Sequence, residues 1–153
     1  MTYRQHRALY TLQHERARMK EILYLHPVGQ TFSFLCGLFN LVSGLTRRMF
    51  VMAIHVNCGA IYYFTALLGA GLGVLATRWA NRSGIPVEME AHEIMAMLLI
   101  MLMAMGATTG LVIMSRPAKR AALLKYHRWI NIAGILVYCG QGVTGVVQLL
   151  KIL

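Results

Sequence analysis

The sequence contains no aspartate and only five glutamates, which are Glu15, Glu21, Glu88, Glu90 and Glu93. None of them lies deep within a long apolar stretch, so these stretches offer no carboxylate chain for relaying protons and no carboxylate ligands for a transported metal ion. Cysteine is scarce as well. Cys36, Cys58 and Cys139 form no CxxC pair, so we expect them to be small core residues and not a redox or zinc motif.

Apolar side chains, by contrast, dominate the sequence. Of its 153 residues, 58% are hydrophobic and 13% are charged, and the mean hydropathy of +0.56 is typical of a membrane protein. A bilayer core about 30 Å thick requires spans of about 20 apolar residues. Four such spans are present, at about 27–45, 49–76, 91–114 and 127–150. We therefore predict an all-α membrane protein, in which residues 23–153 form an up-and-down four-helix transmembrane bundle with both termini on one face.

The net charge of +10 comes largely from basic residues at the ends of these spans. We interpret them as interfacial anchors, with membrane lipid and no nucleic acid as the partner. Residues 1–22 carry five basic side chains and no apolar run long enough for a cleaved signal peptide. We predict that they form a short, basic, amphipathic helix on the membrane surface, and this uncleaved leader favours cytoplasmic N- and C-termini.

Histidines mark the beginnings of the four spans, at His26, His55, His92 and His127. Because successive helices alternate in direction, His26 and His92 approach one membrane face, and His55 and His127 approach the other. The members of each pair come from diagonal helices of a square bundle. Two imidazoles that face each other across a bundle core are what bis-His haem ligation requires.

A stripe of small and polar residues follows each histidine at helical spacing. On the last span it comprises His127, Asn131, Gly134, Tyr138, Gln141, Gly145 and Gln148. The residue 18 positions after each histidine is a glycine, namely Gly44, Gly73, Gly110 and Gly145. Because 18 residues make five helical turns, each glycine lies on the histidine's own face about 27 Å further along, at the level of the other histidine pair. A backbone without a side chain leaves room there for a flat macrocycle.

The sequence therefore predicts two haem groups, one held by His26 and His92 and flanked by Gly73 and Gly145. The other is held by His55 and His127 and flanked by Gly44 and Gly110. The absence of CxxCH excludes the usual covalent attachment of c-type haem. Haem propionates attract positive partners near the membrane surfaces. The candidates are Arg47, Arg48, Lys125 and Arg128 at the His55/His127 face, and Lys20, Arg78 and Arg82 at the other.

The four histidines and their pairing resemble the cytochrome b561 family of transmembrane electron carriers, over residues 26–150. The resemblance implies that each histidine is an axial ligand of a non-covalent b-type haem. It also implies electron transfer across the membrane, commonly from ascorbate or a quinol to an acceptor beyond. The chain differs from the eukaryotic ascorbate-dependent members, because it has four spans where they have six, and no substrate-binding motif carries over.

Three alternatives use the same residues. The chain could be a haem-b membrane anchor subunit of a quinone-linked redox complex, recognised by a stable complex and quinol-dependent haem reduction. It could bind or transport a metal ion through the histidines, with no Soret absorbance. It could also be a haem-free structural subunit. Whether the protein is an electron carrier, an oxidoreductase subunit or a homo-oligomer stays open at this point.

Overall fold

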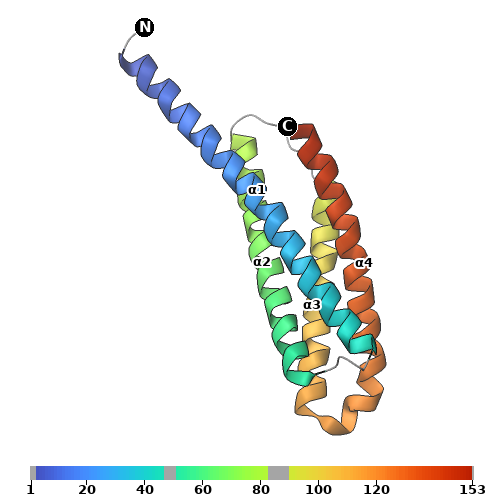
Figure 1. Ribbon diagram of the computed structural model, residues 1–153. Coiled ribbons are helices and arrows are strands. Elements are labelled where there is room, and N and C mark those ends of the chain that lie inside the picture. Colours follow the sequence, from blue (N-terminus) through green and yellow to red (C-terminus); the bar gives the residue numbers. More distant parts are fainter. Residues whose placement is uncertain (1–2, 47–50, 83–89, 153) are drawn as a thin grey trace.

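The computed structural model describes residues 3–46, 51–82 and 90–152, and these residues form helices and short connections. The helices are α1 (Tyr3–Thr46), α2 (Met52–Arg82), α3 (Glu90–Ser115) and α4 (Arg120–Ile152), with a short 3-10 helix, η1 (Pro117–Lys119), between α3 and α4. Successive helices run in opposite directions, so the beginning of α1 and the end of α4 lie toward the same end of the molecule (Figure 1). The predicted up-and-down arrangement of four long helices is confirmed.

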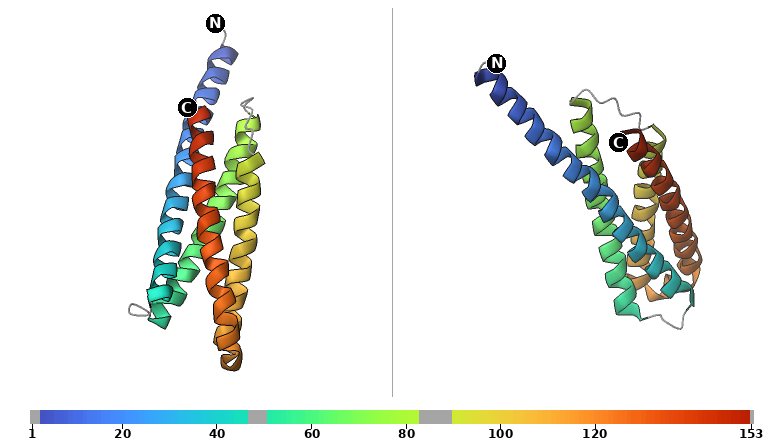
Figure 2. Two further views of the ribbon diagram at one scale, coloured as in Figure 1. Left: turned by 90° about the vertical axis from the view of Figure 1, so that its right-hand side faces the viewer. Right: turned by 45° about the horizontal axis from the view of Figure 1, so that its top comes forward.

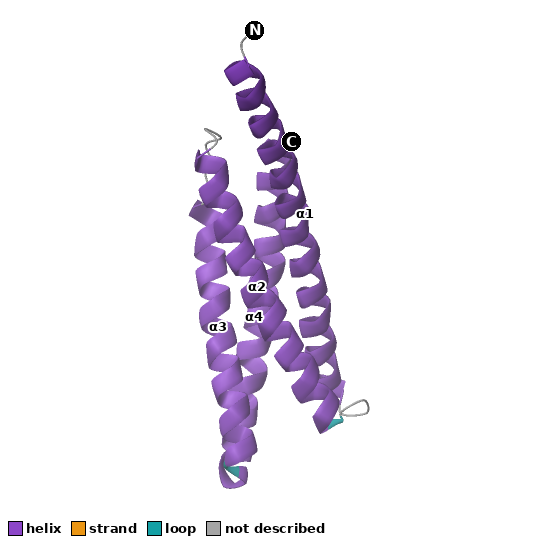
Figure 3. Ribbon diagram, turned by 90° about the vertical axis from the view of Figure 1, so that its left-hand side faces the viewer, coloured by secondary structure: helices purple, strands orange, loops and turns teal. Residues whose placement is uncertain are grey.

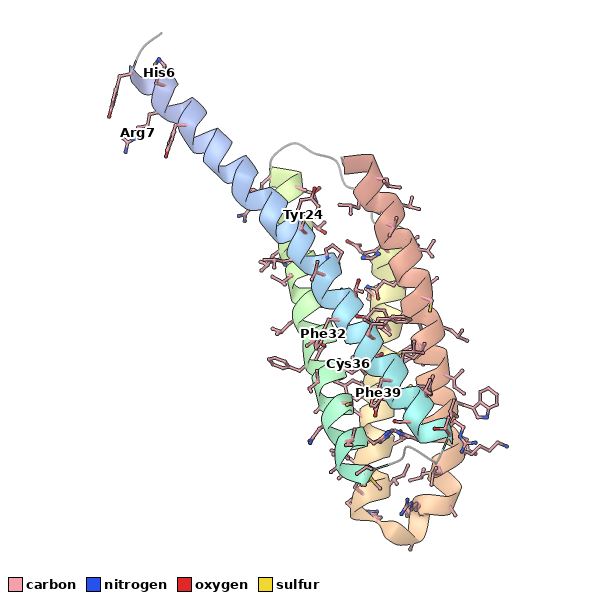
Figure 4. All side chains as sticks on the ribbon, viewed as in Figure 1. His6, Arg7, Tyr24, Phe32, Cys36 and Phe39 are labelled. Carbon is pink, nitrogen blue, oxygen red and sulfur yellow. The ribbon has the colours of Figure 1, made fainter. Side chains whose placement is uncertain are left out.

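All four helices contain a segment that is long and apolar enough to cross a membrane, at Tyr24–Thr46, Met52–Arg82, Ala91–Ser115 and Arg120–Leu150. Their outer surfaces are apolar. Phe64 and Leu111 are 65% and 66% exposed, and Phe32 and Phe39 on α1 are exposed as well (Figure 4). Water disfavours so much exposed apolar surface, whereas lipid does not. The chain thus has the build of a multi-pass membrane protein.

The predicted short N-terminal helix in residues 1–22 is not a separate element. Its described part is the first half of α1, which runs without interruption from Tyr3 to Thr46 and projects beyond the other helices with His6 and Arg7 near its tip (Figure 4). No glycine or proline precedes Pro27 in this helix, and most residues there are good helix formers. His26 and Pro27 therefore lie inside a helix and do not open one, and the Thr31 hydroxyl donates to the Pro27 carbonyl at 2.8 Å.

Two helices are longer than the apolar pattern predicted. Helix α2 continues to Arg82 because residues 77–82 contain no glycine or proline, and Ala80 in this extension is buried. Helix α4 already begins at Arg120, since residues 120–126 are mainly helix formers that follow Pro117. His127 therefore lies about two turns inside α4.

The bundle consists of two helical hairpins, α1–α2 and α3–α4. Within each hairpin the helices pack closely along their length, whereas the two hairpins touch mainly through α1 and α4 (Figures 2 and 3). In the described ranges no Cα atom of α1 comes within 8 Å of α3, and the same holds for α2 and α4. The diagonal helices are thus separated by space that only side chains can cross.

The polar and small stripes of the four helices face this interior. Most of the described buried residues lie on the same helix faces as the four histidines, namely Ser33 and Gly37 on α1, Gly59, Tyr62, Ala66 and Gly69 on α2, Leu99, Met103 and Gly106 on α3, and Gly134, Tyr138 and Gln141 on α4. A central cluster of Tyr62, Ala66, Leu99, Met103 and Tyr138 fills the middle of the bundle. It separates one histidine pair from the other.

Candidate functional site

The four span histidines meet in two pairs across the bundle. His26 of α1 faces His92 of α3 with ring centroids 6.3 Å apart and ring planes at 76°. His55 of α2 faces His127 of α4 with the same separation of 6.3 Å and planes at 66°. These are the diagonal pairs that the helix directions predict, and all four side chains are half-buried.

The separation of the rings has a simple chemical meaning. An imidazole nitrogen binds a metal at about 2.0 Å and lies about 1.15 Å from its ring centre, so two imidazoles on opposite sides of one metal have centroids about 6.3 Å apart. Two imidazoles at a tetrahedral angle would have centroids only about 5.1 Å apart. The observed separation of 6.3 Å equals the first of these values, and it also lies within the range of about 4.5–7 Å for edge-to-face ring contacts.

In three of these four rings, the Nδ1 atom makes a hydrogen bond to a neighbouring helix. Nδ1 of His26 lies 2.7 Å from the Gly69 carbonyl oxygen, which can only accept, so Nδ1 carries the proton and donates it. The free lone pair of this imidazole is then on Nε2. A second group on a histidine ligand fixes its tautomer and orientation in this way at metal sites generally.

His92 and His127 are held by hydroxyl groups. Nδ1 of His92 lies 3.1 Å from Thr144 Oγ1, and Nδ1 of His127 lies 3.1 Å from Thr109 Oγ1. The Thr144 hydroxyl donates its own proton to the Gln141 carbonyl at 3.0 Å, and the Thr109 hydroxyl donates to the Met105 and Gly106 carbonyls. Each hydroxyl thus lies within hydrogen-bond distance of both a carbonyl and an imidazole nitrogen, and the Asn131 Nδ2 atom lies 3.5 Å from Nδ1 of His127 as well.

His55 lies beside the turn of α1 that ends in Gly44. A Cβ atom on Gly44 would lie 3.3 Å from Cε1 of His55, and in the same turn the Ser43 hydroxyl donates to the Asn40 carbonyl at 2.9 Å. Asn40 precedes Gly44 by four residues, and Gly69, Gly106 and Gln141 precede Gly73, Gly110 and Gly145 by four as well. Each histidine therefore contacts the helix turn that leads to one of the predicted glycines.

The four glycines lie at the predicted ends of the bundle but contact imidazoles of their own hairpin. A Cβ atom added to Gly73 would lie 3.0 Å from Cε1 of His26, and one on Gly145 would lie 3.2 Å from Cε1 of His92. The corresponding distance is 3.3 Å for Gly44 and His55, and also for Gly110 and His127. Because these glycines have no side chain, there is room beside each of them for an imidazole ring, and for a flat group next to that ring.

A cavity of about 630 Å³ opens at the His26/His92 pair. Both imidazoles, Gly73 and Gly145 line it, together with aromatic and apolar side chains such as Phe34. Ligand pockets of cofactor size range over about 300–1,000 Å³ and are mainly apolar with a few polar groups. The cavity can therefore take a flat apolar macrocycle between the two hairpins.

The basic residues predicted to bind the haem propionates lie in different parts of the structure. Arg47 and Arg48 lie outside the described residues, as does the Lys20 side chain. Lys125 and Arg128 are exposed and line one hollow of about 480 Å³ together with Trp129, close in sequence to His127. Arg78 and Arg82 are exposed at the end of α2, toward the His26/His92 pair.

Other metal chemistry has little support in the part of the chain that the structure describes. There, no group of three or more His, Cys, Asp or Glu side chains could hold a metal ion. Met97, Met101, Met105 and Met114 of α3 are exposed on its outer surface, so they do not converge on a site.

Sequence reasoning missed the hydroxyl partners Thr109 and Thr144 and the related Ser43. Each immediately precedes one of the four glycines, so a Ser/Thr-Gly pair 17 and 18 residues after a histidine was the available signal. The fourth position, before Gly73, is Leu72. The pattern is visible only once the helix carrying the hydroxyl is known to pack against the helix carrying the histidine.

Comparisons with protein-family models, curated proteins and solved structures find no match to this chain. The resemblance to the cytochrome b561 family, and the roles of the histidines as haem ligands, accordingly remain predictions.

Proposed function

We propose that this protein transfers electrons across a membrane through two non-covalent b-type haems, one bound by His26 and His92 and the other by His55 and His127. The observation that supports this most directly is the separation of 6.3 Å between ring centroids in both pairs. That separation is expected for two opposite ligands of one iron and is too long for a tetrahedral metal site.

The residues around the pairs fit this role. The bond from Nδ1 of His26 to the Gly69 carbonyl leaves Nε2 available, and the contacts of His92 and His127 with threonine hydroxyls orient these two rings across the gap between the hairpins. Haem b would supply a reversible Fe(III)/Fe(II) couple near each membrane face. The protein binds the two groups apart, excludes water from them and keeps them at defined depths.

The middle of the bundle also suits electron transfer without proton transfer. Phe34, Tyr62 and Tyr138 pack together there, with ring centroids 5.6 Å apart for Phe34 and Tyr138 and 6.1 Å for Tyr62 and Tyr138. The polar atoms among them bond locally, since Tyr138 donates to Gln30 and Ser33 donates to the Tyr62 carbonyl at 2.9 Å. Such a packed centre favours electrons over solvated ions.

The donor we propose is a quinol- or ascorbate-type reductant or a redox partner protein, which gives its electrons at one face to reach an acceptor at the other. The N- and C-termini are proposed to face the cytoplasm, where basic segments are enriched. A haem-b anchor subunit of a quinone-linked complex would use the same ligation.

The test is a spectrum of the purified protein. We expect a Soret band, a reduced-minus-oxidised difference spectrum of low-spin b-type haem, and about two non-covalent haems per chain by extraction. A ratio near one haem per chain would mean that one of the two proposed sites binds no haem. Protein that is folded by circular dichroism, was made in haem-replete cells and still lacks Soret absorbance would reject the proposal.

The ring planes give a second spectroscopic prediction. The planes are 76° and 66° apart, and nearly perpendicular axial imidazoles leave the two iron d orbitals that interact with them close in energy. Oxidised protein should therefore give highly anisotropic low-spin EPR signals. The rhombic signals of parallel imidazoles, or a high-spin signal in unmodified protein, would contradict the observed pair geometry.

A further inference from the structure

The end of the bundle where α3 joins α4 is strongly basic (Figure 1). Its exposed basic side chains in the described ranges are Arg116, Lys119, Arg120, Lys125 and Arg128. The stretches of chain that reach this end lie between Glu21 and Glu88 or after Glu93, and the sequence has no acidic residue within these stretches. The chain therefore supplies no carboxylate side chain there to balance the positive charge.

Two of these basic residues line a hollow on α4. Its volume is about 480 Å³, and it is bounded by Ala121, Leu124, Lys125, Arg128 and Trp129. Neighbouring members of this set are three or four residues apart, so all five share one face of the helix. Leu124 and Trp129 are 37% and 60% exposed. The hollow thus presents two cations beside an exposed apolar wall.

This face of α4 points away from the interior of the bundle. His127 lies on the inner face, where its ring meets that of His55. At 100° per residue, Arg128 lies about 100° round the helix from His127, and Lys125 lies about 160° from it. A ligand of the hollow therefore approaches from the surrounding membrane and not from between the hairpins.

The hollow also lies at the depth of lipid headgroups. Residues 129–150, which follow Arg128, contain no charged side chain. A helix of this length extends about 33 Å, which matches a hydrocarbon core about 30 Å thick. Arg128 therefore lies where the hydrocarbon ends, and Lys125 lies nearly one turn further out. Trp129 is of the residue type that is enriched at this level of a membrane.

We propose that this hollow binds the headgroup of one anionic phospholipid. Lys125 and Arg128 bind the lipid phosphate, since a guanidinium donates paired hydrogen bonds to phosphate oxygens and an ammonium adds a point charge. Leu124 and Trp129 contact the glycerol and the first methylene groups. A zwitterionic lipid would bring its own ammonium close to both cations, and like charges repel. This inference concerns the outer surface of α4 and does not depend on haem binding.

Trp129 itself can report on the bound lipid. Trp79 and Trp129 are the two tryptophans of the sequence, so Trp79→Phe leaves Trp129 as the only one. This parent protein is placed in phosphatidylcholine vesicles with increasing fractions of brominated phosphatidylglycerol, because bromine quenches indole fluorescence on contact. Compared with brominated phosphatidylcholine, we expect a relative binding constant about tenfold higher for phosphatidylglycerol. Equal quenching by the two brominated lipids would overturn the inference.

Two double variants of the parent remove the same charge from different places. Lys125→Gln/Arg128→Gln removes the cations of the hollow, whereas Arg116→Gln/Lys119→Gln removes exposed basic residues of the same end that do not line it. We expect the first variant to abolish the selectivity for phosphatidylglycerol and the second to keep it. The same loss in both would mean diffuse attraction by net charge and would contradict a site at the hollow. All four side chains are exposed, so helical circular dichroism should be unchanged.

Two further measurements test the lipid itself. Inorganic phosphate added to the vesicles should leave the quenching unchanged, and displacement of the brominated lipid by phosphate would reject a lipid in favour of a free anion. Native mass spectrometry of the detergent-extracted parent should detect one retained anionic phospholipid. The lipid should also be retained by Arg116→Gln/Lys119→Gln and lost from Lys125→Gln/Arg128→Gln. Its absence from the parent, or its retention by both double variants, would refute the site.

Discussion

Replacing His92 by alanine should remove one haem and leave the other in place. His92 faces His26 across a gap between α1 and α3 that only side chains cross. The variant therefore leaves His26 as the single ligand of that haem. The His55/His127 pair lies on the far side of the Tyr62 and Tyr138 cluster and keeps both imidazoles. The haem content should therefore fall from about two per chain to about one, and in His92→Ala/His127→Ala to about zero.

Controls distinguish loss of a ligand from loss of the fold. His6→Ala changes a histidine on the exposed, projecting part of α1 and should keep both haems. His92→Gly opens a ligand-sized space, so added imidazole should restore the lost absorbance if His92 binds iron. An unchanged haem content in His92→Ala would exclude His92 as a ligand. Loss of both haems from a folded single variant would contradict the independence of the two sites.

Enlarging Gly73 should have a comparably large effect, confined to the same haem. A Cβ atom there would already lie 3.0 Å from His26 Cε1, so a leucine side chain must displace the imidazole or push α2 away from α1. Overpacking of this kind costs about 1–3 kcal/mol in well-packed interiors. We expect Gly73→Leu to lose the His26/His92 haem and to keep the haem of His55/His127, as measured by haem content and by the number of waves in a redox titration.

Gly71 provides the matched control, because it lies on the same helix two residues away with nothing within 4 Å of an added Cβ. Gly71→Leu should keep both haems and gain helix propensity of about 0.8 kcal/mol. Equal haem content in Gly73→Leu and Gly71→Leu would show that the contact with His26 has no part in binding.

The histidine pairs could be predicted without coordinates, because the prediction needed only the alternating directions of the helices and the 3.6-residue helical repeat. The positions His26, His55, His92 and His127 within alternating helices assign each ring to one end of the bundle, and the 3.6-residue repeat assigns it to the inner face. The same repeat identified the buried stripe of α4, including Tyr138 and Gln141. These inferences rely on the geometry of each helix alone, and the spacing of apolar residues in the sequence is enough to define that geometry.

The sequence was less informative about where the helices begin and end and about which residues lie beside each glycine. A proline often begins a helix, yet Pro27 lies deep within α1, because the preceding residues are helical enough to continue through it. Gly73 was expected to make room for a macrocycle at the His26/His92 pair, and only the structure shows that it also lies against His26 of the adjacent helix. Spacing along one helix does not say which surface of the next helix will meet it.

By itself, the sequence determined the four apolar spans, their alternating directions, their inward faces and the two ends at which histidines gather, because helical periodicity and the thickness of a bilayer depend on local order alone. Only the tertiary structure decided that the helices associate as two hairpins and that the paired rings stand 6.3 Å apart. It also decided that Thr109, Thr144 and the Gly69 carbonyl lie within hydrogen-bond distance of Nδ1 of His127, His92 and His26 respectively. Those contacts join residues 18 to 52 positions apart, and their geometry depends on how closely two helices approach and rotate against each other.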